Sequence, residues 1–211
     1  MWTKAISKRN FLVILVYVVI MVCYFAFIDP IDDYISRPNI KHLPSLINNL
    51  SSTDSKTYRE AADRIGDYGE RATSAIPYLI NELKYEDKRI FTCNALAAIG
   101  KVALPDLIYA LDSDDRDTRS GAAYAISEMG PIAKDAVPLL IQRLTDEPDW
   151  QVKAWIIYGL GEIGYASFPA LLVLKEIADD PETGSDPDAK KAIDNIQRSY
   201  KDHKNYSQRF R

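Results

Sequence analysis

Five copies of one four-residue phrase decide the fold of this chain. They are Pro44-Ser45-Leu46-Ile47, Pro77-Tyr78-Leu79-Ile80, Pro105-Asp106-Leu107-Ile108, Pro138-Leu139-Leu140-Ile141 and Pro169-Ala170-Leu171-Leu172. Successive prolines are 33, 28, 33 and 31 residues apart. Internal repeats of this period are typical of architectures in which structural units stack and each unit contacts its neighbours.

Each proline predicts the start of a helix, because the missing N–H of proline costs nothing at the first helical position. In the first four copies, apolar residues follow the proline at +2, +3 and +6, which lie on one narrow face of a helix. These residues are Leu46, Ile47 and Leu50; Leu79, Ile80 and Leu83; Leu107, Ile108 and Leu111; and Leu140, Ile141 and Leu144. The fifth copy departs from this pattern, with Lys175 at +6.

A polar turn and a second helix follow each proline-started helix. Turns such as Asp112-Ser113-Asp114-Asp115 are rich in residues that cap helix N-termini. Each second helix is expected to stop at a left-handed glycine: Gly66, Gly100, Gly130 and Gly164. Small residues five positions earlier, Ala61, Ala95, Ala125 and Gly159, predict close contact between neighbouring helices.

This pattern resembles HEAT repeats, and among them the short type named after phycobilisome lyases (PBS-lyase HEAT-like repeats). The segments Asp114–Gly130 and Val152–Gly164 carry the match, as do Arg89, Arg119 and Lys153, each eleven residues before its glycine; Ser55 breaks this basic column, with Arg59 close by. The resemblance covers roughly residues 43–197 and implies an all-α, HEAT-like solenoid of about four to five helical hairpins. In HEAT arrays, helices placed like the proline-started ones line a concave surface.

The repeats predict a domain over residues 43–200. Residues 43–50 supply a first helix that begins the stack. A last amphipathic helix after Pro187, with Ala189, Ala192, Ile193, Ile196 and Tyr200 on one face, is expected to close it. Beyond it, residues 201–211 form a polar, basic segment that we expect to be disordered.

An apolar segment precedes the repeats. Phe11 to Ile28 is 18 residues without a charge. As a helix it spans roughly 27 Å, close to the ~30 Å hydrocarbon core of a bilayer. A cleaved signal peptide needs small residues near its end, whereas Tyr24–Ile28 is bulky; a lipoprotein signal needs a small residue where Val22 precedes Cys23. We therefore expect an uncleaved transmembrane helix over 11–28, between a basic N-terminus (1–10) and a juxtamembrane linker (29–42).

The basic residues around this segment predict its orientation. Lys4, Lys8 and Arg9 precede it, whereas Arg37 and Lys41 follow it. The positive-inside rule then favours a cytoplasmic N-terminus and an extracytoplasmic repeat domain by a thin margin.

Charge and cysteine usage exclude some classes of function. The net charge is −4, but residues 29–188 hold 16 basic and 28 acidic residues. An acidic middle argues against nucleic acid as a partner, because phosphate binding needs clustered Lys and Arg. The two cysteines, Cys23 and Cys93, belong to different predicted segments, so we expect no intrachain disulfide.

No catalytic or metal-binding constellation emerges from the sequence. The resemblance to HEAT repeats implies that an iron-binding member would carry repeated His-Glu pairs. In this chain His42 and His203 lie far apart, and neither is followed by Glu. Gly159-Leu160-Gly161-Glu162-Ile163-Gly164 matches a dinucleotide-binding pattern but has no strand before it, so we interpret its glycines as packing residues. Asp112, Asp114, Asp115 and Asp117 lack the glycine and distal Glu of a calcium loop; turn and capping roles are preferred, and a weak surface cation site stays open. We expect no enzyme activity, cofactor or metal.

The exposed side of the proline-started helices is the predicted partner-binding site. Its candidate residues are Tyr78, Asn81, Tyr85, Tyr109, Leu139, Gln142 and Arg143. Tyrosine and arginine among amides are typical of protein interfaces. Trp150, Trp155 and Tyr158 form a second aromatic group, for which core packing of Trp155 and Tyr158 is the preferred interpretation.

These features predict a membrane-tethered scaffold that binds a protein partner in or near the same membrane. The alternative is a bilin lyase or chaperone-like protein, which the PBS-lyase resemblance implies. A third interpretation has the basic C-terminal segment contact anionic lipid or an acidic partner.

Overall fold

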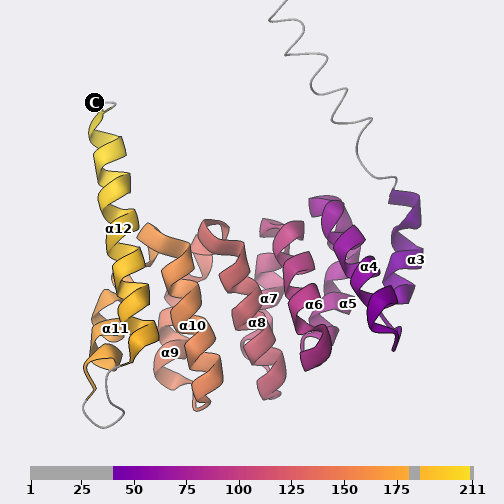
Figure 1. Ribbon diagram of the computed structural model, residues 1–211, viewed down its shortest axis with the longest axis horizontal. Helices are drawn as coiled ribbons and strands as arrows, with labels where there is room; N and C mark the ends of the chain where they lie inside the picture. The colour runs from indigo at the N-terminus through magenta and orange to yellow at the C-terminus, as the bar shows by residue number, and fades with distance from the viewer. Residues whose placement is uncertain (1–39, 181–185, 210–211) are drawn as a thin grey trace, which may run out of the picture. The chain divides into compact units, whose positions relative to one another are not determined.

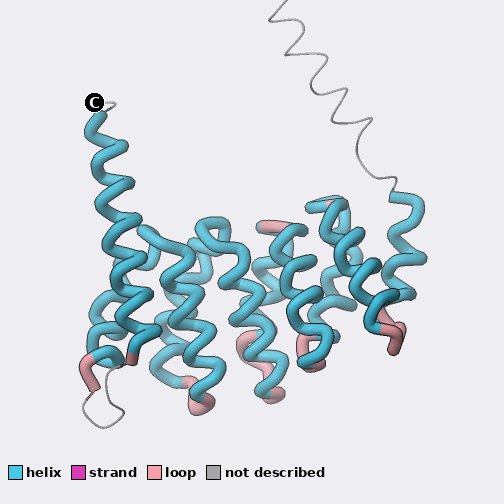
Figure 2. The backbone as a smooth tube through the Cα atoms, in the orientation of Figure 1, coloured by secondary structure: helices cyan, strands magenta, loops and turns pink. Residues whose placement is uncertain are grey.

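The computed structural model describes residues 40–180 and 186–209, and the repeats form one compact unit that begins at Ile40. The expected transmembrane helix over 11–28 and its flanking segments lie outside the described residues. Within the described residues the protein is helical, without a strand (Figures 1 and 2). This confirms the all-α prediction.

Ten α-helices of the described chain form five antiparallel hairpins. The proline layer consists of α3 (Leu43–Asn49), α5 (Ile76–Glu82), α7 (Leu104–Ala110), α9 (Val137–Asp146) and α11 (Leu171–Ala178). The second layer consists of α4 (Ser55–Asp67), α6 (Glu86–Ile99), α8 (Arg116–Met129), α10 (Trp150–Ile163) and α12 (Pro187–Arg209). The 3₁₀ turns are η2 (Ile40–His42), η3 (Gly69–Ala75), η4 (Lys101–Ala103), η5 (Gly130–Ala136) and η6 (Gly164–Ala170). Figure 1 shows the second layer as a row in front of the proline layer.

The core lies between the two layers. Proline begins α3, α5, α7 and α9 within their first two residues, as predicted. The residues at +2 and +6 are buried in all four copies, and those at +3 are half-buried against the core. The apolar face read from the sequence is therefore the seam between the layers.

The second-layer helices approach one another at small residues. A Cβ added at Gly159 of α10 would lie 3.3 Å from the Cβ of Ser127 in α8. A Cβ added at Gly161 would lie 3.1 Å from the Cα of Ala192 in α12. The glycines of the Gly-x-Gly-x-x-Gly match therefore allow helices to pack closely, as the packing interpretation predicted.

The first helix stop was assigned to the wrong glycine. Gly66 lies inside α4 and faces α6, where an added Cβ would be 3.2 Å from the Cβ of Ala98. The left-handed glycine is Gly69, with φ of 55°, and it corresponds to Gly100, Gly130 and Gly164. Counting eleven residues back from Gly69 gives Tyr58 rather than Ser55. The basic column is thus replaced in the first repeat by a buried tyrosine, whose hydroxyl lies 2.6 Å from Thr92 Oγ1.

The fifth proline also differs from the other four. Pro169 lies within η6, and α11 begins two residues later at Leu171. This shift leaves Leu172 exposed and makes Leu174 and Ala178 the buried residues of α11. Lys175 is exposed because it does not belong to the buried face of this helix.

The expected disorder of the C-terminal segment is wrong for residues 201–209, because α12 continues as a helix to Arg209. Two contacts with η6 hold the start of this extension. The hydroxyl of Ser199 accepts a hydrogen bond from the Tyr165 N–H at 3.1 Å, and the rings of His203 and Tyr165 stack at 4.1 Å. An anchored helix with Lys, Gln and Arg residues propagates at little cost.

Length and apolarity alone also pick out helices inside the stack as candidate membrane spans. Trp150–Ala178 passes such a test, as does the pair Glu86–Ile99 and Lys101–Ala110 taken together, although that pair is bent by 113°. Half of the apolar window within Trp150–Ala178 is buried in the fold, as expected for helices of a protein core. This is weak evidence for a span.

We expect Gly100→Ala to lower the free energy of unfolding by about 1–3 kcal/mol, since φ of 88° and ψ of −154° disfavour any side chain. The space around Gly100 is open, so backbone strain is the sole cause. Denaturant unfolding followed by circular dichroism measures the effect. Asn94→Ala, at an exposed site inside α6, is the control and should change stability by less than about 0.5 kcal/mol. Equal stability of the two variants would contradict the assigned turn.

Candidate partner-binding surface

Two tyrosines of the proline layer are its most prominent exposed aromatic side chains. Tyr78 on α5 is 55% exposed, and Tyr109 on α7 is 82% exposed. They lie at +1 and +4 after their prolines, opposite the residues that fill the core. Asn81 and Gln142, on α5 and α9, are also exposed. Tyr78 and Tyr109 thus place large, rigid contact groups on neighbouring repeats.

Tyr85 belongs to a different setting, the loop between α5 and α6. The ammonium groups of Lys84 and Lys88 lie 5.2 and 5.3 Å from the centre of its ring. Lys88 is itself held by Glu82 at 2.6 Å and lies 4.5 Å from the ring centre of Tyr58. Tyr85 is therefore fixed by two cations and reaches solvent at the loop rather than on the helix face.

Leu139 and Arg143 on α9 are less available than the tyrosines. Leu139 is half-buried and packs against the core. The guanidinium of Arg143 pairs with the carboxylate of Asp112 at the end of α7. These residues link neighbouring repeats, and a partner would meet them only at their outer edges. Whether any of the seven predicted residues binds a partner stays a prediction.

A hollow of about 380 Å³ lies where α3 meets α5. Ile47 and Leu50 supply its apolar side, and Tyr78, Asn81 and Glu82 supply its polar side. Two of the predicted residues, Tyr78 and Asn81, thus border a depression with one apolar side.

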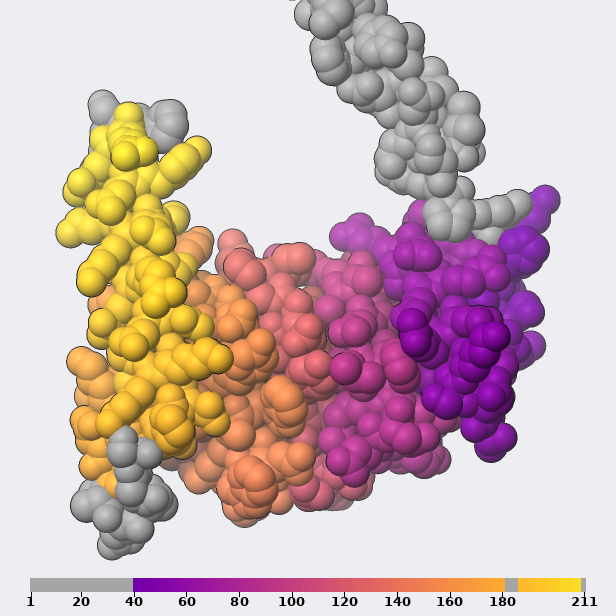
Figure 3. All heavy atoms as spheres, in the orientation of Figure 1, coloured from indigo at the N-terminus to yellow at the C-terminus, as the bar shows by residue number. Residues whose placement is uncertain are grey.

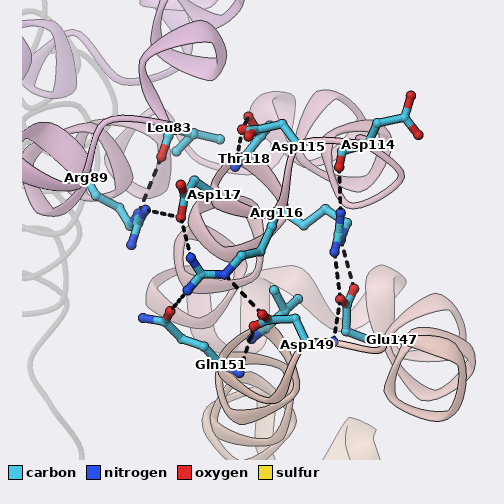
Figure 4. Close-up of polar contacts among 12 residues, drawn as sticks. Leu83, Arg89, Asp114, Asp115, Arg116, Asp117, Thr118, Glu147, Asp149 and Gln151 are labelled. Carbon is cyan, nitrogen blue, oxygen red and sulfur yellow. Dashed lines mark hydrogen bonds and ion pairs between the residues drawn. The ribbon is translucent and has the colours of Figure 1, made fainter.

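The loops between the layers are braced by ion pairs that cross from one repeat to the next (Figure 4). Arg119 makes a two-pronged contact with Glu147, at 2.9 and 2.8 Å, and donates to the carbonyl oxygens of Ser113 and Asp114. The Glu147 side chain is 2% exposed. Burial acts to raise the pKa of Glu147, but the hydrogen bonds from Arg119 and the Asp149 N–H outweigh it and lower the pKa.

Three of the four aspartates considered as a calcium loop have other roles. Asp115 caps α8, accepting from the Thr118 N–H at 2.8 Å, and its pKa is lowered mainly by the Thr118 hydroxyl. Asp112 pairs with Arg143, and Asp117 lies near both Arg89 and Arg116. In the part of the chain that the structure describes, no group of three or more His, Cys, Asp and Glu side chains is placed to hold a metal.

The second aromatic group has two parts. Trp155 is half-buried, packs against the core, and lies 4.4 Å from the ring of Tyr124 and 6.1 Å from that of Tyr158. This agrees with the packing interpretation for Trp155. Trp150, in contrast, is 77% exposed and borders a pocket of about 750 Å³ between α9, α10, α11 and the start of α12.

The sequence did not reveal this pocket. Its walls include Ile157 and Ile177, and its polar residues include Lys153 and Asp180. Lys153 holds the position in the basic column that Arg119 holds one repeat earlier, and it lines this pocket. Cys93 is a buried free thiol, and burial raises its pKa, so it is an inert core residue; Cys23 lies outside the described residues.

Comparisons with known proteins agree with this architecture. The model of the family "HEAT repeats" matches residues 76–161 and 104–197, which together span more than half of the chain. A comparison with curated proteins gives no match. The structure of the CpcE–CpcF complex of phycocyanin lyase from Nostoc sp. PCC7120 is 23% identical, with a TM-score of 0.50 over 75% of this chain and 64% of that chain. An engineered protein, Northeast Structural Genomics Consortium target OR329, is 22% identical with a TM-score of 0.48 over 74% and 80%. At these identities the likeness concerns the fold alone.

We expect Glu147→Gln to destabilise the protein at pH 7 by about 1–3 kcal/mol, because it weakens a buried charged hydrogen bond. The lowered pKa of Glu147 means that the stabilisation is complete above its unfolded pKa of about 4.3 and is lost as pH falls through the folded pKa. The difference between wild type and variant should therefore shrink below about pH 4 in urea unfolding. Glu176→Gln, at an exposed site on α11, should show little difference at any pH. A pH-independent effect of Glu147→Gln would contradict the charge argument.

Proposed function

Because the chain belongs to the HEAT-repeat family, we propose that it is a membrane-tethered scaffold that binds a partner protein through the exposed side of its proline layer. One observation supports this choice of binding surface. Tyr78 and Tyr109 stand on neighbouring repeats of one layer, each more than half exposed, with a hollow beside Tyr78. Aromatic anchors beside a pocket are the usual energetic centre of a protein interface.

The rigidity of the scaffold supports this use. Binding requires the ordering of side chains and loops, and a surface that is already ordered loses less entropy. The pairs Arg119–Glu147 and Arg143–Asp112 join successive repeats, so α7 and α9 are held at a fixed spacing. The part of the surface that carries Tyr109, on α7, is therefore preorganised.

The membrane tether is proposed from the sequence. Phe11–Ile28 has the length and composition of a span, and the basic residues before it favour an extracytoplasmic repeat domain. A tether of this kind raises the effective concentration of the scaffold toward partners in the same membrane. A weak tyrosine-centred surface is then sufficient for capture.

The alternative function is the handling of a bilin. In its favour stand a fold shared with the phycocyanin lyase complex and a pocket of about 750 Å³, a volume in the range of small-molecule sites. The described titratable residues of that pocket are Lys153 and the acidic residues Glu176, Asp180, Asp186 and Asp188. Co-expression with a bilin decides the matter, because visible absorbance on the purified protein would support this alternative over the scaffold.

We expect Tyr78→Ala with Tyr109→Ala to reduce partner capture from native membranes by tenfold or more, because both anchors are lost. Since both side chains are exposed, the variant should keep its thermal unfolding midpoint within a few degrees. Quantitative pull-down measures the effect. The matched control is Ile90→Ala with Trp150→Ala, which removes exposed apolar side chains, 50% and 77% exposed, from the second layer. Equal loss in both variants, or none in either, would reject the proline layer as the binding surface.

The tether predicts that the full chain stays in the membrane pellet after extraction with alkaline carbonate, whereas a chain lacking residues 1–39 is released. Protease added outside intact cells or spheroplasts should digest the repeat domain. Release of the full chain by carbonate would refute the span, and protection of the repeats would refute the proposed side.

A further inference from the structure

The two edges of the helix stack differ in charge. The aspartate edge consists of the loops that lead from the proline layer to the second layer: residues 50–54, 83–85, 111–115, 147–149, 179–180 and 186. These loops carry nine acidic residues and one basic residue, Lys84. The glycine edge consists of η2 to η6 and the end of α12, residues 198–209. It carries eight basic residues and three acidic ones.

The end of α12 is where the basic charge concentrates. Residues 198–209 contain Arg198, Lys201, Lys204 and Arg209, with Asp202 as the one acid. Every residue from 201 to 209 is exposed. Six residues follow His203, whose ring contacts η6, so the helix extends about 9 Å past that contact at 1.5 Å per residue. Figure 3 shows this yellow segment standing clear of the orange helices.

The projecting helix also has an aromatic side. Tyr200, His203 and Tyr206 recur every three residues and share one side of the helix, while Lys201 lies off that side and Lys204, four residues after Tyr200, borders it. His203 stacks on Tyr165, and Tyr200 lies 4.4 Å from the ring of Phe168, so the first two rings fix the direction of the helix. Tyr206, further out, is 66% exposed. A basic helix with an aromatic tip has the composition of an element at a lipid headgroup surface.

The chain enters the repeats on the same edge. Helix α3 runs antiparallel to α4, whose first residue is capped by Asp54 on the aspartate edge, so Ile40 lies on the glycine edge. Eleven residues, 29–39, separate the apolar segment from Ile40 in the sequence and reach at most roughly 40 Å. The entry at α3 and the tip of α12 belong to opposite ends of the row, about 30–40 Å apart at 8–10 Å per helix.

We propose that the basic end of α12 is a second membrane contact, which docks on anionic lipid headgroups. This inference rests on the proposed tether for its geometry. With one attachment before α3 and another at α12, the row of repeats lies along the membrane, and its aspartate edge is turned away by repulsion from the same lipids. The tyrosines of the proline layer then face sideways, toward partners in the plane of the membrane. Anionic lipid is the favoured occupant because cations spaced along a helix need no complementary shape, only a charged surface.

An environment-sensitive fluorophore on the helix tests this. Full-length protein with Cys23→Ser and Ser207→Cys carries the label at residue 207, since Cys93 is buried. It is reconstituted in vesicles of phosphatidylcholine with or without phosphatidylglycerol. We expect a blue shift of the emission with phosphatidylglycerol alone, reversed by high salt. A label at Ser55→Cys, the residue that follows the first loop of the aspartate edge, should show no shift.

Charge variants separate docking from a general electrostatic effect. Lys201→Glu with Lys204→Glu should weaken docking at least about tenfold, read from the phosphatidylglycerol content needed for the shift. Lys201→Gln with Lys204→Gln should give an intermediate loss and guards against a folding defect in the first variant. Lys56→Glu with Lys175→Glu makes the same change in net charge at exposed sites toward the aspartate edge and should leave docking unchanged.

Three results in vesicles would overturn the proposal: no shift at residue 207 in anionic vesicles, an equal shift in neutral vesicles, or equal loss in the two charge-reversed variants. A shift that appears in native membranes but not in pure anionic vesicles would also overturn it, in favour of an acidic protein. Failure of the tether is distinguishable, because carbonate then releases the chain while added anionic vesicles still produce the shift.

Discussion

The structure depends on how closely the second-layer helices approach one another. Gly66, Gly159 and Gly161 each face a small residue of the next helix at a distance that leaves no room for a larger side chain. One hairpin of this chain has too little apolar surface to be stable by itself, and the stack becomes stable because every hairpin covers the next. Close packing of the second layer then determines the spacing of the proline layer, on which the exposed tyrosines stand. Ion pairs such as Arg119–Glu147 link neighbouring repeats at the loops, at the edge of the apolar core.

The sequence predicted those parts of the fold that depend on local chemistry. Prolines at helix starts, leucines at +2 and +6 and aspartate caps such as Asp115 each act within one turn, so their positions could be read directly. The errors arose where two local signals competed. Both Gly66 and Gly69 could end the first second-layer helix. Gly66 instead packs against Ala98, and the left-handed turn falls at Gly69. Pro169 was read as the start of a helix, but it lies inside the 3₁₀ turn η6. The helical extension to Arg209 depends on stacking between Tyr165 and His203, residues 38 positions apart, which no periodicity reveals.

The candidate site was less predictable than the fold for a physical reason. Helical periodicity indicates which side of a helix is exposed, and so Tyr78 and Tyr109 were found. It does not indicate what a long side chain reaches across the gap between repeats. Arg143 pairs with Asp112 of the preceding repeat because the two loops lie within its reach. The pocket beside Trp150 was likewise missed, because it lies between helices of two repeats and no single helix shows it.

The central claim is that the proline layer is the partner-binding face of a tethered HEAT stack. Site-specific photo-crosslinking in native membranes tests it most directly, with a photoreactive phenylalanine analogue at position 109 of the proline layer or at position 90 of the second layer. The account predicts a discrete crosslinked protein from position 109 and none from position 90, at equal expression. A crosslinked species from position 90 alone, or the same species from both, would contradict it.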